Sequence, residues 1–199
     1  MALDKFKSNL QLQSVLLNTW NSEYRRIRDE LLENFTSFLK NEDFSIIKNQ
    51  FSATAKYQTA TLTLEVPKLE KDNLGLFEGR LAIFHAYLKY NKWGEKIHLS
   101  MAIYVVNQDT TAIFGNHNNF VSRFDEYKNE AQKYLDNFKP FQYEIHGVME
   151  NDQSKLGFLE KIDFVTQDSK NTDRKTFKGI EPLVEAVLNN DFSLKNLTR

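Results

Sequence analysis

The first forty residues place apolar side chains at the spacing of a long amphipathic helix. One set recurs every seven residues, at Leu10, Leu17, Tyr24, Leu31 and Phe38. A second set fills the interleaved position with Phe6, Trp20 and Ile27, which is polar at Gln13 and Asn34. Because neither Gly nor Pro interrupts the segment, this heptad spacing predicts a helix over residues 4–40.

The length of this helix poses a packing problem. Unbroken, it would be about 55 Å long, whereas a compact domain of this size has a radius of gyration of about 16 Å. We therefore expect the helix either to break near residues 18–22 or to pack on a second copy of the chain. Further apolar residues, such as Leu12, Leu16 and Phe35, widen the stripe beyond a coiled-coil seam. Packing on the protein's own sheet and dimerisation through residues 4–40 both stay open.

The segment 81–106 alternates apolar and polar residues on both sides of the turn 91–94, which predicts a β-hairpin with two different faces. One face is almost wholly apolar and is expected in the core. The other face carries the polar candidates His85, Tyr87, Lys89, Lys96, His98, Ser100 and Tyr104. With Tyr90 opposite Glu95, His98 would oppose Tyr87. The two histidines would then be diagonal neighbours about 7–8 Å apart.

The remaining pattern alternates short helical and extended segments. The predicted elements are a helix over 43–51, a strand over 57–66 ended by Pro67, a mobile loop over 67–79, an edge strand over 109–114, a helix over 117–138, a hairpin over 141–166 in which His146 opposes Leu159, a polar loop over 167–178 and a helix beginning near Pro182. A helix over 155–163 is the competing reading of part of that hairpin. Antiparallel strands joined by hairpins predict an α+β fold, with a mainly antiparallel sheet of about five strands and helices packed on one face.

Composition narrows the possible functions. The 199 residues predict a single domain, with a helical segment over 1–52 and an α+β core over 53–199. The absence of cysteine excludes disulfides, thiolate metal sites and cysteine catalysis. A net charge of −1 is not typical of a protein that binds duplex nucleic acid. No signal peptide or membrane span is evident, which favours a cytoplasmic protein, and the many Asn, Lys, Ile and Phe residues suggest a bacterial source.

Candidate chemistry is sparse. The sequence contains no phosphate loop, no nucleophile elbow and no zinc-protease motif. His85 and His98 could relay protons as an acid–base pair, with Lys89 and Lys96 attracting a phosphate. Histidines on a half-exposed sheet face are more often ordinary surface residues, and we predict no cofactor and no metal. Charged residues along 25–33, including the pair Arg26–Glu30, are typical of a solvated helix face.

The order helix, three strands, helix, strand resembles the core of the restriction-endonuclease-like nucleases. Those enzymes hold a divalent metal with carboxylates on their second and third strands. Neither 81–90 nor 97–106 contains an acidic residue, so the resemblance is limited to topology.

Three functions remain as hypotheses. The favoured one is a non-enzymatic binding or assembly module, which forms a homo-oligomer, such as a dimer, through residues 4–40. It would engage a protein or a small ligand on the semi-polar sheet face, with Tyr87, Lys89, Lys96, Ser100 and Tyr104 as binding residues. One alternative is a nuclease or hydrolase with a restriction-endonuclease-like topology, either metal-dependent or based on His85 and His98. The other is a nucleic-acid binder that stacks bases on its tyrosines.

Overall fold

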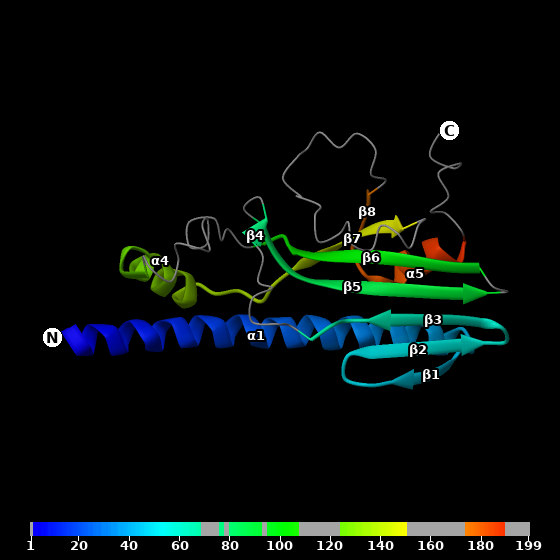
Figure 1. The fold of residues 1–199 in the computed structure, drawn as a ribbon, viewed down its shortest axis with the longest axis horizontal. Coiled ribbons are helices and arrows are strands. Elements are labelled where there is room, and N and C mark those ends of the chain that lie inside the picture. Colours follow the sequence, from blue (N-terminus) through cyan, green and yellow to red (C-terminus); the bar gives the residue numbers. More distant parts are fainter. Residues whose placement is uncertain are drawn as a thin grey trace.

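The chain begins with one unbroken helix, α1 (Ala2–Asn41). The computed structural model describes residues 2–68, 76–77, 80–92, 95–107, 124–150 and 174–189. The predicted helix over 4–40 is confirmed, and the predicted break near 18–22 is wrong. Figure 1 shows that α1 extends beyond the strands and that α4 (Phe124–Asp136) lies beside its N-terminal half. The helix therefore avoids a break by overhanging the sheet.

An antiparallel sheet packs along the C-terminal half of α1 (Figure 1). The strands follow the order β1-β2-β3-β5-β6-β7-β8, and the short β4 pairs with β5. Their bounds are β1 (Ser45–Lys48), β2 (Ser52–Tyr57), β3 (Ala60–Glu65), β4 (Leu76–Phe77), β5 (Arg80–Lys92), β6 (Glu95–Val105), β7 (Tyr143–Glu150) and β8 (Arg174–Phe177). The predicted α+β class is confirmed, with more strands than the five expected.

One face of this sheet is buried beneath helices. Its side chains form a single core with α1 and with the last described helix, α5 (Ile180–Leu188). The sheet contributes small and branched residues, including Ala55, Leu64, Leu99 and Ile103, and α1 contributes larger ones, including Trp20, Ile27 and Phe35. The prediction that helices cover one face is therefore confirmed.

The predicted helix over 43–51 is wrong, because strand β1, a turn and the start of β2 occupy this stretch. Asp43 adopts a positive φ of 62° immediately after α1, which turns the chain away from the helix. The carboxamide oxygen of Asn49 then accepts the backbone N–H groups of Phe51 and Ser52, which closes a tight turn into β2. A second turn, at Gln58 with φ 50°, starts β3 later than the predicted strand over 57–66.

The predicted hairpin over 141–166 is wrong in its first arm, which is the part that the structure describes. Strand β7 pairs with β6 along one edge and with β8 along the other, over Ile145–Val148. Both edges are therefore occupied there, so His146 does not pair with Leu159 as expected; its register partners are Ala102 and Thr176. The end of the predicted polar loop over 167–178 is strand β8. The predictions over 69–75, 109–114, 117–123 and 151–166 lie outside the described residues.

Candidate functional site

The heptad stripe of α1 changes from exposed to buried along its length. Leu10 and Leu17 are 49% and 45% exposed, whereas the next residues of the same set, Tyr24 and Leu31, are 4% and 1% exposed. Leu3 and Phe6 continue the exposed end. The same stripe therefore serves the protein's own core over its C-terminal half and faces solvent over its N-terminal half.

The exposed part of the stripe is narrow and straight. At 100° per residue, Leu3, Phe6, Leu10 and Leu17 lie within about 60° of one another around the helix axis. Val15 is equally exposed, at 46%, but it lies about 160° away from Leu17. Four aligned apolar side chains that meet water are typical of a surface used for interaction. We call these four residues the exposed stripe.

The chemistry around the exposed stripe is also unusual for a surface helix. Over the fifteen residues from Ser8 to Ser22 the sequence contains no charged side chain. Depletion of charge is typical of the centre of protein–protein interfaces, whereas free helix surfaces are normally charged. Helix α4 covers a neighbouring face of α1, where Leu12 packs with Ala131 and Leu135. These contacts leave the exposed stripe uncovered.

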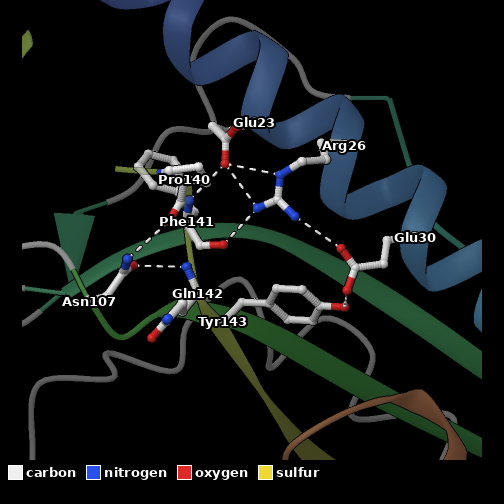
Figure 2. Close-up of polar contacts among 8 residues, drawn as sticks. All are labelled: Glu23, Arg26, Glu30, Asn107, Pro140, Phe141, Gln142 and Tyr143. Atoms are coloured by element: carbon white, nitrogen blue, oxygen red, sulfur yellow. Dashed lines mark hydrogen bonds and ion pairs between the residues drawn. The ribbon is translucent and has the colours of Figure 1, made fainter. Parts of the chain in front are cut away.

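A polar cluster fixes the chain that follows α4 onto the middle of α1 (Figure 2). Phe141 donates its backbone N–H to Glu23 Oε2 at 2.7 Å, and its carbonyl oxygen accepts from Arg26 Nη2 at 2.6 Å. Arg26 also donates Nε and Nη2 to Glu23 Oε2, at 3.1 and 2.9 Å. Both backbone polar groups of the buried Phe141 are thus satisfied by side chains of a helix distant in sequence.

The cluster continues from Arg26 through Glu30 to Tyr143 (Figure 2). Arg26 Nη1 donates to Glu30 Oε2 at 2.9 Å, and Tyr143 Oη donates to Glu30 Oε1 at 3.2 Å. The hydrogen bond to Glu23, more than any other contact, raises the pKa of the Arg26 guanidinium. The predicted Arg26–Glu30 pair is confirmed, but it belongs to a partly buried network. The arrangement anchors the start of β7 to α1.

The charged face over 25–33 is less solvated than predicted. Arg28 is only 8% exposed, and its guanidinium lies over the ring of Phe51, 5.3 Å from the centroid. It also donates to Asp29 Oδ1 at 2.6 Å. Spacing along α1 alone could not reveal this, because the ring that covers Arg28 comes from the β1–β2 turn.

Two tyrosines near this cluster make the fold sensitive to alkaline pH. Burial raises the pKa of Tyr134, on α4, to about 12, although its contact with Trp20 acts in the opposite direction. Burial, and then the charge of Glu30, raises the pKa of Tyr143. Free tyrosine ionises near pH 10, so above that pH the unfolded chain releases protons that the folded chain retains. The stability that these two buried tyrosines contribute is therefore fully present below about pH 10 and is lost as the pH rises toward the raised pKa of Tyr134, about 12.

We expect the urea midpoint to be level between about pH 8 and 9.5 and to fall steadily above pH 10. Replacing Tyr134 with phenylalanine should reduce that slope, because the side chain no longer titrates. An unchanged slope in both Tyr134→Phe and Tyr143→Phe would contradict this assignment.

The predicted histidine pair does not form. In the β5–β6 hairpin Lys92 pairs with Glu95, so the register is displaced by two residues from the one predicted. A shift of two keeps the β5 residues from Phe84 to Lys92 on their predicted faces. A bulge between Ala82 and Phe84 changes the register beyond them, so that Ala82, predicted on the apolar face, opposes Tyr104. His98 nevertheless opposes Lys89, and His85 opposes Ala102. The two histidines are therefore separated by four residues along the strands, about 13 Å, and are not diagonal neighbours.

The other predicted site residues lie on the same sheet face, and one of them, Lys89, is held in an ion pair. Lys89 Nζ lies 2.6 Å from Glu65 Oε2, which occupies the ammonium group that was expected to attract phosphate. Tyr104 is buried, and Tyr87 pairs with Ser100 across the strands. The side chains of His85, Lys96, His98 and Ser100 lie outside the described part of the structure. Catalysis or binding by this face stays a prediction.

The described residues contain neither a metal-binding cluster nor a membrane span. Within residues 2–68, 76–77, 80–92, 95–107, 124–150 and 174–189, no three His, Asp or Glu residues are placed to hold a metal ion. No helix in the same residues is long and apolar enough to cross a bilayer. No protein-family model, curated protein or solved structure matches this chain.

Proposed function

We propose that this protein is a non-enzymatic assembly module that pairs with a second copy of itself through the N-terminal half of α1. The observation that carries the proposal is the exposed stripe, which continues a core-forming heptad face beyond the end of the protein's own sheet. Apolar side chains at heptad spacing are suited to packing against another helix with the same spacing.

A second copy fits this surface better than a charged partner does. The segment 8–22 offers no charge to attract an acidic or basic ligand, and it creates no repulsion when it meets itself. The stripe spans residues 3–17, about 22 Å of helix at 1.5 Å per residue. An interface of this length falls at the small end of specific interfaces, so we expect a dissociation constant in the micromolar range.

The test is a pair of charge substitutions on the stripe. We expect the wild-type chain to shift from monomer to dimer as its concentration rises from about 1 to 200 μM in sedimentation or light scattering. The double variant Leu10→Glu, Leu17→Glu should stay monomeric over that range, because two charges would be buried at the interface. Circular dichroism should show unchanged helix content, since both side chains are exposed.

Val15→Glu is the matched control. Val15 is as exposed as Leu17 but lies on a different face of the same helix, so this variant should dimerise like the wild type. A wild-type chain that is monomeric at about 200 μM would refute the proposal. The proposal would also be refuted if Val15→Glu weakened dimerisation as much as the double variant does.

A further inference from the structure

We infer that the two copies pair in antiparallel orientation, so that the N-terminal turn of one α1 lies against Leu17 of the other. This inference rests on the proposed self-association. It concerns which part of the partner completes the exposed stripe, and it follows from where each sheet sits relative to that stripe.

The face that would meet the partner is blocked farther along the same helix. Tyr24 and Leu31 continue the stripe of Leu10 and Leu17, but they are buried in the core that α1 forms with its own sheet. The hydroxyl of Tyr24 donates to the carbonyl oxygen of Pro67, immediately after β3. From about residue 20 onward, therefore, the protein's own strands occupy the space on that side of α1.

A parallel partner would run into this obstacle. Packed helices lie about 8–10 Å apart, and a sheet packed on another layer needs about 10 Å. Two parallel copies would have to place both sheets between the two helices after residue 20, where that spacing leaves no room. In an antiparallel pair the helices overlap only over their N-terminal halves. Each sheet then lies beyond the N-terminus of the partner helix (Figure 1 shows one copy with this overhang).

The positions of the apolar and of the charged residues in the N-terminal half of α1 are both compatible with the antiparallel orientation. When the overlap is centred on Leu10, residue 3 of one copy lies level with residue 17 of the other and residue 6 lies level with residue 14, so the whole exposed stripe is covered. The charged residues of the first 22 positions are Asp4, Lys5 and Lys7. In the antiparallel pair they lie level with the uncharged residues 13–16 of the partner, whereas a parallel pair would place Lys7 of one copy level with Lys7 of the other.

Disulfide trapping tests the orientation, and the chain suits this method because it has no cysteine of its own. Leu3→Cys and Leu17→Cys are made as separate proteins of different tagged mass, mixed, and oxidised. We expect mainly the mixed product, in which position 3 of one copy is joined to position 17 of the other. In the antiparallel pair two copies of residue 17 are about 21 Å apart along the axis, and two copies of residue 3 are equally far apart. A disulfide requires Cα atoms within about 7 Å.

Two further variants make every outcome decisive. Leu10→Cys lies at the centre of the overlap and should form a homodimer, which shows that pairing and oxidation occur. Val15→Cys faces away and should form little product. If Leu3→Cys and Leu17→Cys each crosslink mainly with themselves, the antiparallel orientation is overturned. It is also overturned if the mixed product is missing while Leu10→Cys crosslinks. A chain that is monomeric in light scattering and gives no Leu10→Cys product would instead refute the proposed self-association.

Discussion

Replacing Phe35 with alanine is expected to lower the free energy of unfolding by about 3–5 kcal/mol. Phe35 is fully buried, at 0% exposed, between α1 and the sheet. Its removal deletes a ring from a packed apolar core, so both the transfer free energy and the cavity contribute to the loss. Urea unfolding followed by circular dichroism measures the change at a protein concentration below that of pairing.

Phe6→Ala is the matched control for this experiment. The same substitution is made on the same helix, but Phe6 is 59% exposed and belongs to the exposed stripe. We expect its effect on the unfolding of the monomer to be within about 0.5 kcal/mol. Equal losses from the two variants would show that the C-terminal half of α1 does not form the core described above.

Replacing Glu23 with alanine is expected to have the second-largest effect, a loss of about 1–3 kcal/mol. The side chain is 12% exposed and accepts hydrogen bonds from Arg26 and from the backbone of Phe141. Removal leaves the N–H of Phe141, a residue that is 3% exposed, without its acceptor. An unsatisfied buried donor costs more than the bond itself contributes, because water cannot replace the lost partner. The urea midpoint reports the loss.

The ion pair of Glu33 with Lys48 provides the comparison. It is as short as the contacts within the Figure 2 cluster, at 2.6 Å, but the Glu33 side chain is 65% exposed. The ammonium of Lys48 holds the pKa of this carboxyl below its usual range. Glu33→Ala should leave the urea midpoint unchanged within experimental scatter, since exposed pairs are screened by water. A larger effect for Glu33→Ala than for Glu23→Ala would contradict our account of the cluster.

Local sequence patterns predicted some elements well and others poorly, for identifiable reasons. The helix over 4–40 could be predicted because its period repeats over five heptads without Gly or Pro. The stretch 43–51 could not, because its conformation depends on a positive φ at Asp43 and on the side-chain hydrogen bonds of Asn49. The hairpin over 81–106 was found with its faces in place from Phe84 onward, but its register depends on the conformation of the turn and on a bulge between Ala82 and Phe84. The observed register differs from the predicted one by two residues, and in it His85 and His98 are not neighbours.

The Glu23–Arg26–Phe141 cluster shows another limit of the sequence. Spacing along α1 revealed the Arg26–Glu30 pair, which is local. The backbone group that makes the cluster structurally important lies 115 residues away. The periodicity of a helix cannot predict a contact with a backbone group so far away in the sequence.

The sequence by itself determined that α1 is a helix and which of its faces is apolar, because both properties follow from the 3.6-residue period of a local hydrogen-bonded structure. Only the tertiary structure decided which part of that face is covered. Tyr24 and Leu31 are buried by strands far along the chain, whereas Leu10 and Leu17, with the same chemistry and spacing, extend past the sheet and remain in water. Burial depends on where distant segments pack, and a helical repeat carries no information about that.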